Sequence, residues 1–259
     1  MTPAMANSET DFIMPDWNAA PAEVGALSTT RHGGVSRAPY DDGAGGGGMN
    51  LGAHVGDRPE DVLQNRAMLE VLLPAHPAWL TQVHGARVVD AATVSGAPEA
   101  DASFTTQSGV VCAIQTADCL PVLFCDTAGR AVGAAHAGWR GLASGVLQNT
   151  VAAMRDAGAA EIIAWLGPAI GPQQFEVGPD VVDAFDALGC TQAFKPIDGQ
   201  PGKYLADIYA LARAALQSVG VQRIDGGGFC TVTEAQRFYS YRRDRVTGRM
   251  ATLIWLKFP

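Results

Sequence analysis

The sequence has no hydrophobic run long enough to cross a membrane. A transmembrane helix needs about 20 consecutive apolar residues, and no stretch of the 259 residues approaches that length. The N-terminal residues carry Glu9, Asp11 and Asp16 but no basic region and no long apolar run, which excludes an ordinary signal peptide. We therefore expect a cytoplasmic protein that has no membrane partner.

Positive charge is also scarce. There are 18 lysines and arginines against 26 aspartates and glutamates, so the formal net charge is −8 at pH 7. A protein that binds nucleic acid has to neutralise many phosphates, and this balance argues against such a partner. The basic run that contains Arg242, Arg243 and Arg249 favours internal ion pairing over a nucleic-acid site. A local group of arginines can still bind a small anion.

Cysteines are few, and their spacing does not pair them. The five form an odd number without close pairs, which fits a reduced cytosolic protein better than a disulfide framework. Four of them lie in or beside apolar segments and are expected in the core or behind a site: Cys112, Cys125, Cys190 and Cys230. Cys119 is different, because it lies at a predicted turn just before Pro121.

The chain does have enough apolar residues for a sizeable core. With 47% hydrophobic and 17% charged residues, it is expected to fold. No repeat and no Pro/Ser-rich linker divides it, so we assign residues 1–20 to a loose leader and residues 21–259 to one domain. The glycine-rich segment 41–48 is expected to be a mobile loop, and the Gly/Pro-rich segment 166–178 is typical of a pocket wall.

The pattern of apolar residues predicts an α+β fold. Helices are predicted over residues 57–73, 141–158 and 204–220, where apolar residues recur at helical spacing. Short strands are predicted around residues 25–30, 78–83, 86–91, 110–116, 120–126, 131–136, 161–167 and 250–258. Because strands outnumber helices and come in runs, we expect a mixed β-sheet core covered by helices.

Three side chains that bind metals or act as nucleophiles lie at predicted strand ends: His84, Cys119 and His136. Two imidazoles and a thiolate suit Zn²⁺, and three protein ligands would leave one position for a catalytic water. The spacing of the three matches no local zinc motif, so two other interpretations stay open. Cys119 could be a thiolate nucleophile paired with a histidine, or the group could be a buried thiol beside two hydrogen-bonded histidines.

The remaining histidines carry weaker signals. His32 and His54 lie in glycine turns, where a structural or rim position is favoured over metal ligation. His76 lies between prolines in a loop and is expected to be solvated.

The segment HAGWRG, residues 136–141, suggests an anion site. Gly138 and Gly141 permit a tight turn, and a helix starting near Leu142 would point its free amides back at that turn. Arg140 would add positive charge. A plain turn that carries a surface arginine explains the same residues equally well.

Eight motifs follow one another along the chain: TTRHGGVS, NLGAHVGD, QVHG, TADCLPVLF, AAHAGWRG, LGPAIGPQQFEVG, YLADI and YSYRRDRVTGRMA. Over about residues 24–257 the chain resembles the YfiH-like family. Members of that family are labelled laccase-domain or polyphenol oxidase proteins, and also purine nucleoside phosphorylases with adenosine deaminase activity. The resemblance implies that residues 21–259 form a single catalytic domain of the YfiH-like type.

The resemblance also implies roles for particular residues. It assigns zinc binding and catalysis to His84, Cys119 and His136, and substrate contacts to Asn50 and Arg66. For phosphate we expect Arg140 to be the contact, with Arg66 and Arg31 as the next candidates. The glycine run ahead of Met49 is longer than the usual link in the family and borders the expected site.

The two family labels differ in the histidines that they require. A blue multicopper oxidase binds several copper ions, and it needs about eight histidines beyond those of its type 1 copper. This chain has five histidines in total. Phenol oxidation would then depend on one adventitious copper. The usual zinc-deaminase pattern H-x-E…P-C-x-x-C is absent as well, so deamination would use a different set of residues.

We therefore predict a zinc-dependent enzyme, with Cu²⁺ as a substitute ion, that acts on purine nucleosides and phosphate. The implied reactions are phosphorolysis of adenosine, inosine, guanosine and methylthioadenosine, and hydrolytic deamination of adenosine. The alternatives are a cysteine- or metal-dependent amide hydrolase that edits peptidoglycan precursors, a copper-dependent polyphenol oxidase, and a metal-binding module without catalytic activity.

Overall fold

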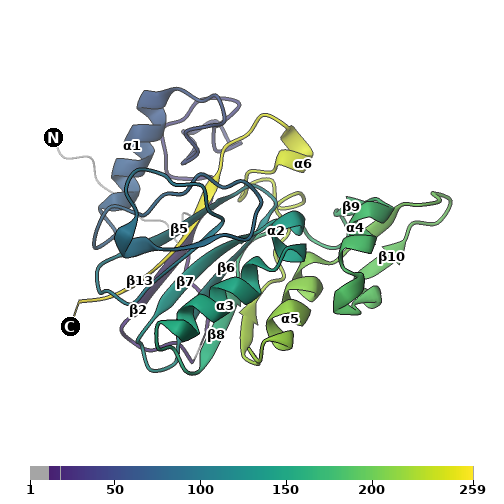
Figure 1. Ribbon diagram of the computed structural model, residues 1–259. Helices are drawn as coiled ribbons and strands as arrows, with labels where there is room; N and C mark the ends of the chain where they lie inside the picture. Colours follow the sequence, from purple (N-terminus) through teal and green to yellow (C-terminus); the bar gives the residue numbers. More distant parts are fainter. Residues whose placement is uncertain (1–11, 18, 259) are drawn as a thin grey trace.

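Two β-sheets packed face to face form the centre of the molecule (Figure 1). The computed structural model describes residues 12–17 and 19–258. The larger sheet has six strands in the order β12 (Ile224–Gly226), β8 (Ile162–Leu166), β6 (Leu120–Asp126), β7 (Val132–Ala137), β4 (Ala102–Thr105) and β3 (Val88–Asp90). The pairs β12–β8 and β3–β4 are parallel and the other pairs are antiparallel. The predicted mixed sheet is confirmed.

The second sheet is antiparallel throughout. Its order is β1 (Phe12–Ile13), β2 (Val24–Thr29), β13 (Met250–Leu256) and β5 (Val111–Thr116). Strand β1 and the buried Trp17 belong to the segment that the sequence assigned to a loose leader. In the described part of that segment the prediction was wrong, because β1 pairs with β2 and Asp16 accepts a hydrogen bond from the Trp165 indole at 3.3 Å. Residues 1–11 and 18 of the expected leader lie outside the described residues.

Alternation of side chains along each strand builds a separate core on each face. In β6, Val122 and Phe124 face the helices, whereas Leu123 and Cys125 face the second sheet. Each large apolar side chain buried in this way stabilises the fold by about 1.5–3 kcal/mol. The continuous apolar run of β6 is therefore required by burial on both faces.

Two of the longer helices cover the outer face of the six-stranded sheet (Figure 1). The longer ones are α1 (Pro59–Glu70), α3 (Val146–Asp156) and α5 (Ile208–Ser218), and the shorter ones are α2 (Trp139–Ala143), α4 (Pro179–Ala184) and α6 (Tyr241–Asp244). Three 3-10 turns are also present, η1 (Ala91–Thr93), η2 (Asp186–Leu188) and η3 (Thr191–Ala193). Helices α3 and α5 pack on the six-stranded sheet, and α1 lies beside the outer face of the second sheet. The α+β architecture is confirmed.

Two predicted helices were too long. The helix expected over residues 141–158 is two helices, because Gly145 adopts the left-handed conformation (φ 87°) between α2 and α3. The helix expected over residues 204–220 begins at Ile208, because the Asp207 carboxylate caps it by accepting a hydrogen bond from the Ala210 amide at 3.0 Å. The residues ahead of this cap form β11.

Strand β11 (Tyr204–Ala206) belongs to a small third sheet, between β10 (Phe194–Pro196) and β9 (Glu176–Val177). Figure 1 shows this sheet and α4 projecting beside the main body of the molecule. The strand predicted over residues 78–83 is absent from the described residues. Only isolated bridges form there, at Ala78 and Thr81, and this irregular course leads directly to His84.

None of the helices in the described ranges is long and apolar enough to span a membrane. The glycine-rich segment 41–48 forms a turn around Asp42, whose carboxylate accepts hydrogen bonds from the Ala44 and Gly46 amides at 2.8 Å each. Mobility of that segment stays a prediction.

Candidate metal centre

The fold brings together the three side chains that the sequence singled out. The imidazole nitrogens of His84 and His136 and the thiol sulfur of Cys119 all lie within 4.8 Å of one another. Among the described residues this is the one group of histidine, cysteine and acidic side chains arranged to hold a metal ion. The three come from an irregular segment, from the turn between β5 and β6, and from β7.

His84 lies on a bend whose backbone is held in an unusual conformation. Its φ of 60° falls in the left-handed region, which costs a non-glycine residue free energy. The buried carboxylate of Asp101 offsets this cost, since it accepts hydrogen bonds from the amides of Val83, His84 and Gly85 at 3.2, 2.9 and 2.7 Å. The His84 side chain remains exposed, so the bend presents an imidazole at the surface of the site.

The same carboxylate orients the second histidine. His136 is buried in β7, and its Nδ1–H donates to Asp101 Oδ1 at 2.8 Å. This hydrogen bond fixes the tautomer and leaves Nε2 free to face Cys119 and His84. Asp101 is therefore a positioning residue for two of the three candidate ligands. No local motif in the sequence marks an aspartate just ahead of β4, so this role of Asp101 was not predicted.

The charges inside the trio favour a thiolate. Burial alone would raise the pKa of Cys119, but the positive charge of His136 and hydrogen bonds from both histidines outweigh burial and lower this pKa to about 6. Burial alone would lower the pKa of His136, but the negative charge of Cys119 and the hydrogen bond to Asp101 outweigh it and raise this pKa to about 9. A cysteine that loses its proton this readily is suited to metal ligation.

The geometry fits a zinc ion. Tetrahedral bonds of about 2.3 Å to sulfur and about 2.0–2.1 Å to nitrogen would place the sulfur and nitrogen ligand atoms about 3.6 Å apart. The observed distance from Cys119 Sγ to His84 Nε2 is 3.8 Å. Two imidazoles and one thiolate fill three positions of a tetrahedron, and the exposed His84 borders the fourth.

Glycines allow helix α2 to approach the trio closely. A Cβ on Gly138 would lie 2.8 Å from Cys119 Sγ and 3.0 Å from His84 Cδ2, and a Cβ on Gly141 would lie 2.8 Å from the Gly85 carbonyl oxygen. This close packing accounts for the glycines of the HAGWRG segment. The helix begins at Trp139 and not near Leu142 as predicted.

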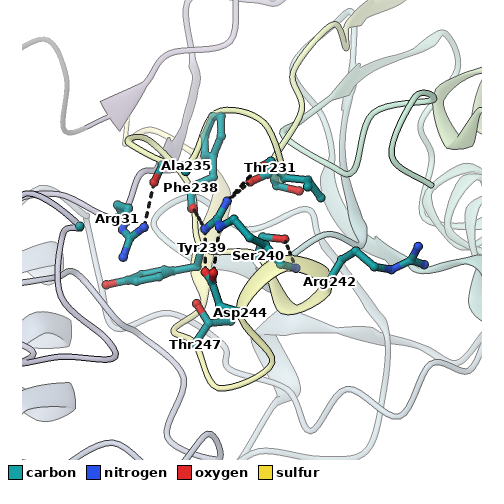
Figure 2. A network of polar contacts seen from close by, with 12 residues as sticks. Arg31, Thr231, Ala235, Phe238, Tyr239, Ser240, Arg242, Asp244 and Thr247 are labelled. Carbon is teal, nitrogen blue, oxygen red and sulfur yellow. Dashed lines mark hydrogen bonds and ion pairs between the residues drawn. The ribbon is translucent and has the colours of Figure 1, made fainter. Parts of the chain in front are cut away.

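Three of the four residues that were predicted to bind substrate lie around residues 49–51, whereas the fourth lies on α2. The exposed Arg140 stacks over the Trp139 ring at 4.3 Å. Arg31 is buried, and its guanidinium already donates hydrogen bonds within the protein, to the carbonyl oxygens of Asp41 and Ala235 at 2.8 Å each. Figure 2 shows the bond to Ala235 beside the Tyr239 ring.

Asn50 and Arg66 lie close together. The Asn50 amide is fully buried, accepts from the backbone amides of Gly52 and Arg249 at 2.9 Å each, and donates to Asp57. Its polar atoms are thus engaged within the loop. Arg66, on α1, is half-buried against the Trp79 ring at 4.4 Å. Substrate contact by any of the four residues stays a prediction.

The C-terminal arginines mostly bind backbone carbonyls. Arg243 pairs with Asp244 at 2.7 Å, so the expected internal ion pairing is confirmed for this residue. Arg242 and Arg249 form no ion pair with the described residues and donate instead to carbonyl oxygens. The buried carboxylate of Asp118, next to Cys119, accepts from the Arg242 backbone amide at 2.6 Å, and this bond ties the segment to the Cys119 turn.

A cavity of about 440 Å³ lies against the loop predicted to be a pocket wall. It is lined by residues 171–174 of that loop and by residues on α5 and the 227–233 segment. None of the trio lines this cavity, so it is separate from the candidate metal centre.

Comparisons with known proteins agree over nearly the whole chain. The family described as multi-copper polyphenol oxidoreductase laccase matches residues 25–257. A purine nucleoside phosphorylase of Pseudomonas aeruginosa is 53% identical over 248 residues, which cover 95% of this chain and 98% of the relative. The purine nucleoside phosphorylase YfiH of Escherichia coli is 52% identical over 251 residues, with coverage of 95% and 98%.

Solved structures show the same fold. The crystal structure of a Neisseria meningitidis protein, NMB0706, superposes with a TM-score of 0.88 at 52% identity, covering 96% of this chain and all of that protein. YlmD from Geobacillus stearothermophilus superposes with a TM-score of 0.85 at 31% identity, covering 98% and 99%. The resemblance found in the sequence is confirmed. With this sequence similarity, this fold and this trio, the chain belongs to the YfiH-like family of enzymes, the family also described as multi-copper polyphenol oxidoreductase laccases.

Proposed function

We propose that the protein is a zinc-dependent enzyme that phosphorolyses purine nucleosides and deaminates adenosine. The names of the relatives support a nucleoside-processing enzyme, with purine nucleosides and phosphate as substrates. The observation that carries the proposal is the His84–Cys119–His136 trio, whose ligand atoms lie within 4.8 Å of one another at a site where His84 is exposed. Cytoplasmic location and the absence of a nucleic-acid partner stay predictions of the composition.

The residues of the chain have separate tasks in this proposal. Zinc held by the trio would supply Lewis-acid chemistry at its open position. Asp101 holds the His136 tautomer and the His84 bend, so the ligands are oriented before substrate arrives. In phosphorolysis a phosphate oxygen forms a bond to ribose C1′ as the bond to the purine nitrogen breaks, which yields ribose 1-phosphate and the free base. In deamination water replaces the 6-amino group of adenosine and ammonia leaves.

A multicopper oxidase is disfavoured by the positions of the remaining histidines. Among the described residues no second group of metal-binding side chains accompanies the trio. His76 pairs with Glu70 at 2.7 Å, and His32 lies 3.9 Å from Asp42. One copper ion in place of zinc is compatible with two imidazoles and a thiolate, and weak oxidation of phenols would then depend on that substitution.

The lowered pKa of Cys119 favours one rival, an amide hydrolase in which this thiolate attacks a carbonyl carbon. The two proposals differ in how the sulfur reacts. A nucleophilic thiolate is free and is alkylated quickly by iodoacetamide, whereas a zinc-bound thiolate is protected until a chelator removes the ion.

The test is product analysis on zinc-loaded protein, incubated with adenosine or inosine with and without phosphate. We expect free base and ribose 1-phosphate only when phosphate is present, and inosine from adenosine in either case. Cys119→Ala should lose zinc and both activities, and the matched control Cys190→Ser, a buried thiol outside the trio, should retain them. Full zinc occupancy without conversion of any nucleoside would refute the proposal and leave a non-catalytic metal-binding module.

A further inference from the structure

Two half-buried arginines beside the candidate metal centre form no ion pair with a carboxylate of the described residues, although Glu70 acts on Arg66 and Asp118 acts on Arg249 from a longer distance. Arg66 lies on α1, and Arg249 lies just ahead of β13. The arginine–carboxylate ion pairs of the described residues involve neither of them. Because the chain carries a net charge of −8, two guanidinium groups without a contact ion pair are not explained by a shortage of acidic residues.

Each guanidinium is anchored along one edge only. Nε and Nη2 of Arg66 donate to the Leu51 carbonyl oxygen at 3.0 and 2.8 Å. Nη1 of Arg249 donates to the carbonyl oxygens of Thr247 and Gly248 at 3.0 Å each. Within the described residues this leaves Arg66 Nη1 and Arg249 Nε and Nη2 without a protein acceptor, and none of these atoms is sealed from solvent. Held in place yet unpaired, these donors are available to a ligand.

The two arginines meet at one short segment. Arg66 binds the Leu51 carbonyl, and the Arg249 backbone amide donates to the Asn50 side chain at 2.9 Å. His54 lies slightly further along the same segment. The Arg249 side chain lies against Gly52, two residues ahead of His54, since a Cβ on Gly52 would lie 2.8 Å from Arg249 Cγ. Partial burial and then the positive charges of Arg249 and Arg66 lower the pKa of His54.

The basic cluster of Arg66, Arg249 and His54 also lies near the trio. Met250, the residue after Arg249, pairs with Thr116, which lies three residues ahead of Cys119. Burial lowers the pKa of Arg249, and the negative charges of Cys119 and Asp118 oppose this effect. The Leu51 carbonyl that anchors Arg66 also accepts a hydrogen bond from Gln115 at 3.3 Å, and Gln115 lies on β5, which leads into the Cys119 turn. A ligand held by the cluster would thus lie beside the candidate metal centre.

We propose that Arg66, Arg249 and His54 form a binding site for inorganic phosphate, the co-substrate of phosphorolysis. The identity of the anion rests on the proposed function. Planar guanidinium groups match the oxygens of phosphate in pairs, and a neutral imidazole adds one more donor. The site differs from the one expected at Arg140, whose guanidinium is exposed and stacked on Trp139.

The experiment measures binding of inorganic phosphate to the zinc-loaded protein by calorimetry, without nucleoside. Wild-type protein should bind phosphate, and Arg66→Gln and Arg249→Gln should each raise the Kd about ten- to a hundredfold, the loss expected for charge-assisted hydrogen bonds. The matched control Arg155→Gln removes an exposed arginine from α3, outside the cluster, and should leave the Kd unchanged.

A second readout separates binding from folding. Arg249 also holds backbone carbonyls, so Arg249→Lys, which keeps the charge but loses the fork, should recover part of the affinity. In phosphorolysis the KM for phosphate should rise in both glutamine variants, while the KM for the nucleoside should change less than about threefold. Thermal unfolding with and without phosphate reports stability, and the stabilisation by phosphate should shrink in the variants.

The outcomes distinguish this inference from the proposed function. If wild-type protein binds phosphate and the variants do not, yet no nucleoside is cleaved, the anion site stands and the proposed function fails. An unchanged phosphate Kd in both glutamine variants would overturn the anion site, whatever the activity. The same holds if the wild-type protein does not bind phosphate at millimolar concentration.

Discussion

Replacing Asp101 with asparagine tests whether one carboxylate positions the candidate metal ligands. The substitution keeps the size of the side chain but exchanges one acceptor oxygen for an NH₂ donor. Oδ1 faces His136 Nδ1 and the His84 amide, and Oδ2 faces the Gly85 and Val83 amides. Whichever way the amide turns, a new N–H group therefore faces two donors. If it faces His136, that histidine must move its proton to Nε2, where a metal would bind.

The magnitude follows from these contacts. Each lost hydrogen bond to a charged acceptor is worth about 1.5–3 kcal/mol. Part of this loss falls on the stability of the bend and part on the metal. Removing a carboxylate behind a metal-binding histidine typically weakens metal binding about 10–100-fold, or about 1.4–2.7 kcal/mol. We expect Asp101→Asn to weaken zinc binding within that range and to lower the rate of both nucleoside reactions.

The assay is zinc affinity by competition with a chelator, together with thermal unfolding of the metal-free protein. The matched control is Asp126→Asn, another fully buried carboxylate, which accepts hydrogen bonds from Arg130 and from the Ala160 amide far from the trio. The control should lose stability but keep zinc affinity. If Asp101→Asn behaves like the control, losing stability but binding zinc as tightly as the wild type, then Asp101 supports the fold and does not position the ligands.

Three further predictions concern the glycines, the acid stability and the metal. In Gly138→Ala the added Cβ would lie 2.8 Å from Cys119 Sγ, so zinc affinity should fall, whereas the backbone at φ −61° is not strained by alanine. In Gly145→Ala the backbone at φ 87° is strained but no contact is closer than 3.8 Å, so the variant should lose about 1–2 kcal/mol of stability and keep its zinc affinity. The reverse pattern would contradict this prediction. Burial alone would raise the pKa of Asp126, but hydrogen bonds outweigh burial and lower this pKa below 3.8. The ionised carboxylate therefore stabilises the fold above pH 3.8, and this stabilisation is lost as the pH falls through the lower folded pKa. Urea unfolding should show that Asp126→Asn is less stable than the wild type at neutral pH and that the difference narrows in acid, whereas a constant difference at every pH would contradict this. Phenol oxidation should be slow, should require added copper and should vanish after chelation and zinc reconstitution, whereas three or four tightly held coppers per chain would contradict the single site.

The strands could be predicted because burial on two faces leaves a plain signal. The runs that became β6, β7, β8 and β13 are mostly apolar, and burial in a sheet interior is the simplest reason for that. Helix ends were harder. The break at Gly145 depends on a left-handed glycine, and a glycine inside an amphipathic pattern is also compatible with a continuous helix.

The trio could be found from the sequence, but its support could not. Histidine and cysteine at predicted strand ends are visible as residue types, whereas Asp101 matters only because β4 pairs with β7 and brings it against His136. Arg66 was predicted as a substrate contact, but its grouping with Arg249 was missed for the same reason. Arg66 and Arg249 are distant in sequence, and only the fold shows that they share the segment at Asn50 and Leu51.

The hydrogen bonds that Asp101 accepts from the His84 amide and the His136 ring mean that folding can assemble the trio before any ion arrives. Zinc fingers, by contrast, fold only when the ion binds. A preformed set of ligands would let an ion leave and return while the chain stays folded, so metals would exchange in the native protein. Divalent copper binds nitrogen and sulfur donors more tightly than zinc does. The loading history of a preparation, set by the metals it has met during growth and purification, would then determine which chemistry an assay detects.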